Sequence, residues 1–199
     1  MASTVAHADE PDESLMLHFA AGDISAFDTL YARHEMGVWR YVLRSVREPA
    51  LADDLMQEVW FAVARQAHAY RPTARFTTWL FTMAHNRMVD HFRTARQHLR
   101  LDDPSPDSGY GCGSALADTL TADSGFGPVR QLESRQQAVA LIEAVEQLPH
   151  EQREAFLLQA EGGLRVEEIA TTTGVSFETA KSRLRYARNH LRQRLKEFA

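Results

Sequence analysis

VEEIATTTGVSFETAKSRLRYARNHLR, residues 166–192, has the pattern of two short helices joined by a tight turn. Val166 and Ile169 supply apolar positions of a first helix. Gly174 allows the turn, because a residue without Cβ adopts positive φ at little cost. Ser176 is a natural N-cap for the second helix. The stretch therefore predicts a helix-turn-helix.

The second helix of this motif separates apolar from basic side chains. At about 100° per residue, the basic side chains fall in a narrow arc and the apolar ones about 80° away. The apolar positions are Ala180, Leu184, Ala187, Leu191 and Leu195, and the basic ones are Lys181, Arg185, Arg188 and Arg192. Residues 181–196 hold seven Lys or Arg and no acid, in a chain of net charge -5. This predicts DNA contact through the major groove; an ordinary amphipathic hairpin with a solvated basic face is the alternative.

Composition limits the remaining classes. No stretch approaches 18 consecutive apolar residues, so we expect no membrane span. The first 13 residues are polar and acidic, without the apolar core of a signal peptide. Cys112 is the only cysteine, which excludes an internal disulfide and fits a reduced cytoplasmic setting. The nine histidines show no repeated ligand spacing, so no metal or other cofactor is predicted.

The chain divides into three parts after a polar tail at residues 1–12. Residues 13–97 and 131–199 have helical periodicity, and no strand alternation of useful length appears. Residues 98–130 are rich in Gly, Ser, Pro and Asp, with 5 acidic and 2 basic residues. Such a composition cannot bury enough apolar surface to order itself. We therefore predict an all-α protein: two small helical domains joined by a flexible acidic linker.

The clearest helix of the first domain is LADDLMQEVWFAVARQA, residues 51–67. Leu55 and Val59 lie on one side of it. A second side is mixed, and it carries Asp54, Gln57, Glu58 and Phe61. Two carboxylates one turn apart beside an aromatic form either a binding patch or a solvated face with Phe61 tucked against a neighbouring helix.

The next stretch, AYRPTARFTTWLFTMAHNRMVDHFRTARQH, combines a loop with a helix. Pro72 breaks the chain, leaving residues 71–76 as a loop before a helix that starts near Thr77 or Thr78. Aromatic and basic residues beside an exposed loop suit unstacked bases. Trp79 could serve as a stacking platform or simply be buried.

Together these segments resemble a bacterial RNA polymerase sigma factor of the extracytoplasmic-function group, the smallest sigma-70 type. DESLMLHFAAGDISAFDTLYARH is similar to the opening helix pair of that family, and ADDLMQEVWFAV to its segment that binds core polymerase. FTTWLFTMAHNRMVDHFR is similar to its promoter-melting helix, and IEAVEQLPHEQREAFLL precedes the helix-turn-helix. Residues 13–97 then correspond to a sigma-2-like bundle and residues 131–199 to a sigma-4-like domain.

The resemblance implies three sets of binding residues and no catalytic ones. The set implied for core polymerase is Asp53, Asp54, Gln57 and Glu58. The set implied for the -10 element is Arg71, Arg75, Phe76, Asn86, Asp90 and Arg93. The set implied for the -35 element is Ser176, Glu178, Thr179, Lys181, Ser182, Arg183, Arg185 and Arg188. The implied partners are the clamp helices of the largest polymerase subunit, the flap of the second-largest, promoter DNA and an anti-sigma factor.

Two other function classes are alternatives to a sigma factor. A two-domain transcriptional regulator would explain residues 166–192 equally well, but it leaves the segments at residues 51–67 and 76–93 without a role. Such a regulator binds duplex DNA without polymerase. A helical nuclease or other enzyme needs a metal cluster or a nucleophile with its base, and the sequence shows neither pattern.

Overall fold

The computed structural model describes residue 7 and residues 9–102 and 128–196, with the backbone alone described at residues 95–102 and 128–136. The helices are α1 (Asp12–Ala20), α2 (Ile24–Val46), α3 (Pro49–Gln66), α4 (Phe76–Asp102), α5 (Pro128–Glu146), α6 (His150–Ala160), α7 (Val166–Thr173) and α8 (Phe177–Leu195), with a 3-10 turn η1 (Ala67–Ala69). Across these ranges every regular element is helical, which confirms the predicted all-α class.

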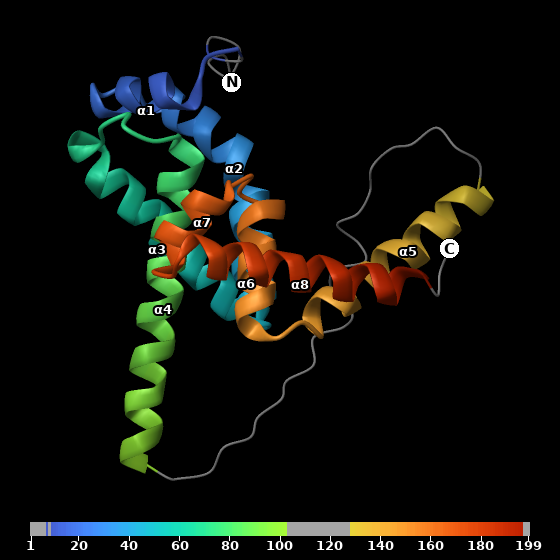
Figure 1. Ribbon diagram of the computed structural model, residues 1–199. Helices are drawn as coiled ribbons and strands as arrows, with labels where there is room; N and C mark the ends of the chain where they lie inside the picture. The colour runs from blue at the N-terminus through green and yellow to red at the C-terminus, as the bar shows by residue number, and fades with distance from the viewer. Residues whose placement is uncertain (1–6, 8, 103–127, 197–199) are drawn as a thin grey trace.

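The first module, α1 to α4, forms a bundle around aromatic and aliphatic side chains. Leu55 and Val59 of α3 point into it, as predicted, and both are almost fully buried. Asp23 caps α2, because its Oδ1 accepts a hydrogen bond from the backbone N–H of Ser25 at 3.0 Å. Beyond this bundle, α4 continues downward as a free-standing helix (Figure 1).

The second module contains the predicted helix-turn-helix in α7 and α8. Gly174 ends α7 with a φ of 67°, in the left-handed region that glycine tolerates. Ser176 caps α8, since its Oγ accepts from the backbone N–H of Thr179 at 3.2 Å. Ile169 and Leu184 are buried between the two helices. Both the turn and the cap are confirmed.

The two modules pack against each other, with α6 and α7 lying against α2 and α4. The turn after α6 makes the tightest approach. A Cβ on Gly162 would lie 2.9 Å from the Phe81 ring of the first module and 2.9 Å from the Leu158 carbonyl oxygen. Phe81 and Leu164 are almost fully buried at this contact. A side chain at position 162 would therefore force a shift of its own turn, of the Phe81 ring, or of both.

The described helices extend into both ends of the range predicted to be the linker. Helix α4 continues to Asp102 and α5 begins at Pro128, so both enter the range 98–130. Residues 103–127, with Cys112, and the tail at 1–6 lie outside the described residues, and the division into domains stays a prediction. Among the helices that are described, none is long and apolar enough to cross a membrane.

Candidate polymerase and promoter interfaces

Helix α3 presents an exposed surface of mixed chemistry, which we call the α3 surface: Asp53, Asp54, Gln57, Glu58 and Phe61. Phe61 is 66% exposed, so the alternative that it tucks against a neighbouring helix is wrong. Within the described residues, the side chains of Asp54, Gln57 and Glu58 form no hydrogen bond or ion pair. Leu55 and Val59, on the opposite side, hold the helix in the core. The α3 surface is thus available to a partner without any rearrangement.

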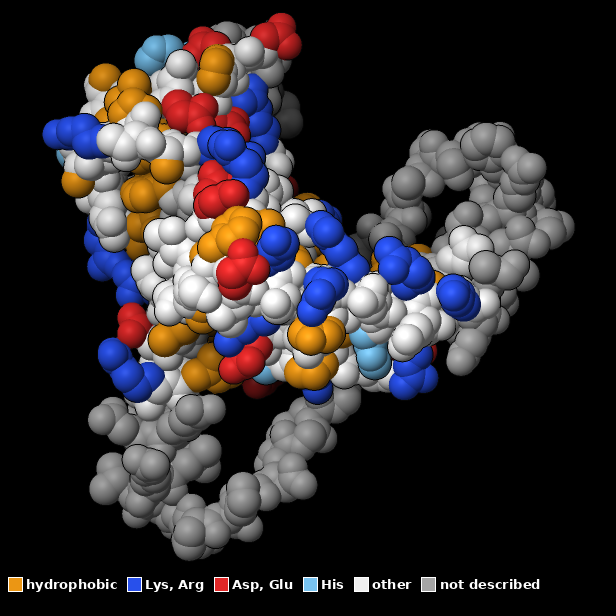
Figure 2. All heavy atoms as spheres, in the orientation of Figure 1, with side chains coloured by type: hydrophobic (Ala, Val, Ile, Leu, Met, Phe, Trp, Pro, Cys, Tyr) orange, Lys and Arg blue, Asp and Glu red, His pale blue; other side chains and the backbone are white. Residues whose placement is uncertain are grey.

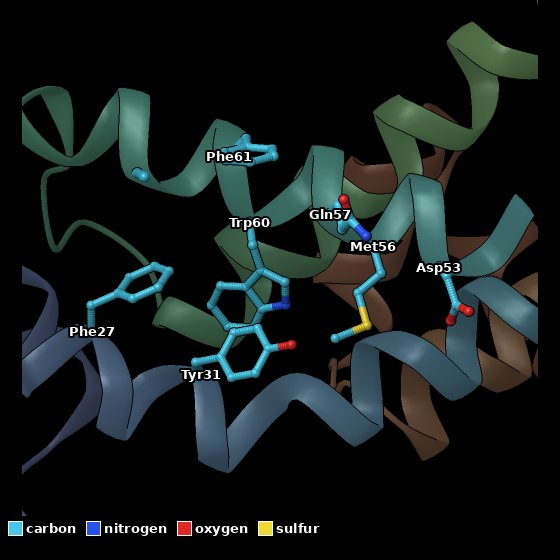
Figure 3. A pocket seen from close by; sticks show the side chains of 8 residues that line it. Phe27, Tyr31, Asp53, Met56, Gln57, Trp60 and Phe61 are labelled. Carbon is cyan, nitrogen blue, oxygen red and sulfur yellow. The ribbon is translucent and has the colours of Figure 1, made fainter. Parts of the chain in front are cut away.

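A groove of about 470 Å³ runs beside the α3 surface, between α2 and α3 (Figure 3). Tyr31 packs against Trp60 with ring centroids 4.9 Å apart, and Met56 lies next to them in the groove. The indole Nε1 of Trp60 is buried and has no hydrogen-bond partner within the described part of the chain. At one end Trp39 Nε1 donates to Asp53 Oδ1 at 2.8 Å, which fixes this carboxylate. The groove is largely apolar with an acidic end.

The segment at residues 71–76, predicted to bind the -10 element, touches the second module through Arg75, while residues 71–74 are exposed. Arg75 Nη2 donates to Glu168 Oε2 at 2.5 Å and to the Gly163 carbonyl oxygen at 2.8 Å. Thr78 Oγ1 donates to the other Glu168 oxygen at 2.8 Å. Arg71 is exposed, and its guanidinium donates to the carbonyl of Tyr70 at 2.8 Å. Arg75 is therefore bound to Glu168 of α7, although its side chain remains 40% exposed.

Phe76 differs from the prediction. It was expected in the loop, but it is the first residue of α4 and is completely buried. Its backbone N–H donates to Glu13 Oε1 at 2.7 Å, which ties the start of α4 to α1. The Phe76 ring contacts Tyr70 and Trp79, so Trp79 also packs into this cluster. In this conformation the Phe76 ring has no free face for a base.

Glu168 is held as an anion by its surroundings. Burial alone would raise the pKa of this carboxyl, but hydrogen bonds from Arg75, the backbone N–H of Arg165 and Thr78 oppose it and lower the pKa to about 2. The carboxylate is thus charged throughout the physiological range. A second acid of the same module, Glu161, binds Arg40 at 2.8 Å and Arg44 at 3.1 Å on α2.

Two further polar pairs lie in the module contact. His85 Nδ1 of α4 lies 2.9 Å from Glu154 Oε1 of α6, and both side chains are mostly buried. Thr82 Oγ1 lies 3.0 Å from Thr172 Oγ1. The sequence analysis did not single out Glu154, Glu161 or Glu168. No local pattern marks them, because their partners lie in a distant part of the chain.

Three further residues predicted for the -10 element lie along α4. Asn86, Asp90 and Arg93 are all exposed. Asp90 and Arg93 form an intrahelical ion pair at 2.9 Å, with both side chains more than half exposed. A pair this exposed contributes little to stability. Asp90 and Arg93 can therefore break this pair and bind a ligand at little cost.

Helix α8 carries the predicted -35 surface. Figure 2 shows Lys and Arg side chains gathered along its outer face. Lys181, Arg185 and Arg188 are exposed there, as predicted from the helical spacing. Arg188 donates to Gln159 Oε1 at 2.5 Å, and Arg183, with a side chain 19% exposed, pairs with Glu151 at 3.2 Å. The remaining members, Ser176, Glu178, Thr179 and Ser182, lie on the first turn and a half of the same helix.

Arg185 and its neighbour Tyr186 form a second local pair on this face. The guanidinium lies 5.0 Å from the Tyr186 ring centre. Near the start of α8, Lys181 lies 3.9 Å from Glu178. The start of α8 thus carries one acidic and one basic side chain, and the later turns carry basic side chains.

Comparisons with known proteins agree with this geometry. Residues 30–98 match the family Sigma-70 region 2, and residues 138–191 match Sigma-70, region 4. The chain is 33% identical to RNA polymerase sigma factor CarQ of Myxococcus xanthus, over 92% of this chain and 97% of that protein. It is 31% identical to ECF RNA polymerase sigma factor SigL of Mycobacterium tuberculosis, over 90% and 94%.

A solved structure has the same fold. It is the sigma factor RpoE of Bartonella quintana in complex with the anti-sigma factor NepR, which matches with a TM-score of 0.64. The match covers 85% of this chain and 96% of that one at 20% identity. The two region matches, in this order and with these full-length relatives, favour a polymerase subunit over a separate regulator. The chain belongs to the sigma-70 family as an extracytoplasmic-function sigma factor, which binds core RNA polymerase and directs transcription initiation at promoters.

Proposed function

We propose that this sigma factor binds core polymerase through the α3 surface, reads the -35 duplex with α8, and captures an unstacked -10 base with residues 71–76 and the exposed side of α4. The α3 surface carries the proposal. Phe61 is 66% exposed beside three polar side chains that have no partner within the described residues. Such a surface is typical of a protein interface, which the sigma factor needs for core polymerase.

The chemistry of the α3 surface suits a protein partner with basic and apolar groups. An exposed aromatic beside polar side chains is typical of a protein interface. Asp54 and Glu58 lie one turn apart and add negative charge, which steers a basic surface toward them. The apolar groove beside them offers a place for a side chain of the partner. We assign this surface to the clamp helices of the largest subunit.

The basic face of α8 suits the phosphates flanking a major groove. Lys181, Arg185 and Arg188 give charge without fixing sequence, whereas Glu178 in the first turn can accept from cytosine N4. Binding should weaken steeply with salt, because each phosphate contact releases counterions. The flap of the second-largest subunit is proposed as the polymerase contact of this module.

The -10 site needs a rearrangement before it can act. Arg75 must exchange Glu168 for DNA, so we propose that α7 leaves residues 71–76 when the promoter is engaged. Unpairing the captured base costs a few kcal/mol, which the other contacts must offset. Two modules on one tether raise the effective concentration of the second contact. Melting is then driven by capture of the open strand, with no catalytic step by this chain.

We also propose regulation by an anti-sigma factor, since the solved Bartonella quintana relative was captured with one. Action in the cytoplasm follows from the proposed polymerase partner. The surfaces described above give no residue that identifies this regulator.

The decisive experiment is reconstitution with core RNA polymerase. We expect the purified chain to co-elute with core polymerase in size exclusion and to support run-off transcription from a subset of genomic fragments. Mapping the 5′ ends would give the -10 and -35 elements. A chain that shifts duplex DNA alone and never co-elutes with polymerase would replace this proposal with the regulator.

A further inference from the structure

A cluster of possible metal ligands lies at the N-terminal end of the first module, apart from the surfaces discussed above. His7, Glu10 and His18 each offer one possible ligand atom, and these atoms lie within 4.8 Å of one another. His7 Nδ1 lies 2.9 Å from Glu10 Oε1, and His18 Nδ1 lies 3.2 Å from Glu10 Oε2. Ligands of a tetrahedral zinc ion with bonds of 2.0–2.1 Å are about 3.3 Å apart. The three groups are therefore already close to zinc-binding spacing.

The backbone that carries two of these ligands is held by Arg33 of α2. Its Nη2 donates to the His7 carbonyl at 3.0 Å, and its Nη1 donates to the Glu10 carbonyl at 2.7 Å. The same guanidinium pairs with Asp12 at 2.6 Å at the start of α1. The third ligand, His18, stands in the last turn of α1. The segment and the helix are thus fixed relative to each other without help from the cluster.

Asp23 gives His7 the outer partner that metal-binding histidines use. Its Oδ2 lies 3.0 Å from His7 Nε2, while its Oδ1 accepts from Ser25 N and Ser25 Oγ. A carboxylate on the far nitrogen fixes the ring orientation. His7 Nδ1 here donates to Glu10 Oε1 at 2.9 Å, so a metal ion that binds Nδ1 must displace that proton. This arrangement places His7 Nδ1 as the ligand atom and Asp23 in the outer shell.

Glu10 supplies a separate observation. Its Oε2 is buried and has no hydrogen-bond partner among the described residues, although His18 Nδ1 is only 3.2 Å away. A buried carboxylate oxygen without a donor is costly. A cation between Glu10 and His18 would satisfy this oxygen and both histidines at once.

We propose that His7, Glu10 and His18 bind a zinc ion, with water completing a tetrahedral site. Two imidazoles and one carboxylate favour zinc over calcium or magnesium, which prefer sites made of oxygen ligands alone. The site joins the chain before α1 to the end of α1, and through Asp23 to the start of α2. Because zinc binds the folded arrangement, it stabilises the N-terminal half of the first module.

The test uses the untagged full-length chain after removal of metal with a chelator. Titration with zinc, followed by calorimetry at neutral pH, should show one ion per chain. Cobalt should give the visible absorption bands of a tetrahedral site. His18→Ala should weaken zinc binding by about tenfold or more. His18 is 49% exposed, so its loss should leave the fold intact.

His68→Ala is the matched control, because His68 is exposed on the 3-10 turn and distant in sequence from the cluster. It should bind zinc like the native chain. Zinc at about 100 times its Kd should raise the Tm of the native chain and of His68→Ala by several degrees, and that of His18→Ala much less. Equal zinc affinity in the two variants would overturn the proposal. So would an absence of stoichiometric binding, which would show that the cluster is an ordinary His–Glu ion-pair network.

Discussion

The α3 surface and the segment at residues 71–76 lie in the same module but differ in what they face. Asp54, Glu58 and Phe61 are exposed to solvent, without partners within the described residues. Arg75 instead binds Glu168 of the second module, and Phe76 is buried. The proposed polymerase surface is therefore exposed in this conformation, whereas two residues of the proposed -10 segment, Arg75 and Phe76, already have partners within the protein. If the proposed sites are right, promoter binding must replace the contact between Arg75 and Glu168, whereas binding at the α3 surface leaves the module contact in place.

The largest expected effect comes from reversing the charge of the α3 surface. Asp54→Lys with Glu58→Lys should weaken binding to core polymerase by about 100-fold or more, because like charges then face each other in the interface. Both residues are exposed, so the fold should be unchanged. Co-elution with polymerase, together with circular dichroism, measures the two effects separately.

A charge-matched control sharpens this result. Asp28→Lys with Glu143→Lys makes the same change in net charge at two exposed positions outside the α3 surface. It should keep polymerase binding within a few-fold of the native chain. If both double variants lose binding equally, the effect comes from total charge and the assignment of the α3 surface is wrong.

Removing the exposed aromatic should have the next largest effect. Phe61→Ala should weaken polymerase binding by about tenfold, the usual loss for an anchor worth more than 1 kcal/mol. The free energy of unfolding should change little, since the ring is 66% exposed and supports no core contact. Titration of labelled polymerase measures the affinity, and urea denaturation measures the free energy of unfolding. An unstable variant with native affinity would mean that Phe61 is structural.

Neutralising the acids that hold the modules together should open the protein. In Glu161→Gln with Glu168→Gln, the ion pairs to Arg40, Arg44 and Arg75 are lost, which shifts the closed–open equilibrium by about tenfold or more. Small-angle scattering should show a larger radius of gyration. The α3 surface is untouched, so polymerase binding should remain.

The matched control for opening is Glu143→Gln with Glu167→Gln, two exposed acids whose side chains make no ion pair within the described residues. It should keep the native radius of gyration. An unchanged radius in the Glu161 and Glu168 variant would show that apolar contacts around Phe81 and Leu164 keep the modules closed on their own.

The helix-turn-helix could be predicted because its determinants are local. Gly174, Ser176 and the spacing of apolar side chains all lie within residues 166–192, and each acts on its own neighbours. The α3 surface was predictable for the same reason. Leu55 and Val59 determine which side of the helix is buried, and the opposite side must then be exposed.

The contact between Arg75 of the proposed -10 segment and Glu168 could not be predicted, because it joins residues far apart in the sequence. Arg75 and Glu168 are 93 residues apart and lie in different modules. An arginine at position 75 can bind DNA, a carboxylate or water equally well. Only the packing of the two modules determines which of these partners it has. His7 and His18 escaped notice similarly, since their spacing matches no ligand motif until α1 and the turn before it bring them together.

The smallest expected effect is a pH dependence that belongs to Glu168. Its pKa is lowered from 4.5 to about 2 in the folded chain, so the carboxylate contributes stability that is fully present above about pH 4.5. This contribution is lost as the pH falls toward 2, because the folded state must then take up a proton that the unfolded state already holds. The native chain should therefore be more stable than Glu168→Gln above pH 4.5, by an amount that does not change with pH.

Urea denaturation of the two chains at neutral pH, near pH 4.5 and near pH 3 measures this difference directly. Other carboxyl groups titrate in both chains, so their effects on the difference in free energy of unfolding cancel. A difference that shrinks only at the lowest pH therefore reports on Glu168 itself. If the difference in free energy of unfolding between the native chain and Glu168→Gln stays constant down to pH 3 and below, Glu168 does not bind Arg75 as an anion. Arg75 would then be free for DNA in the isolated protein, and the contrast between an open polymerase surface and a closed -10 site would no longer hold.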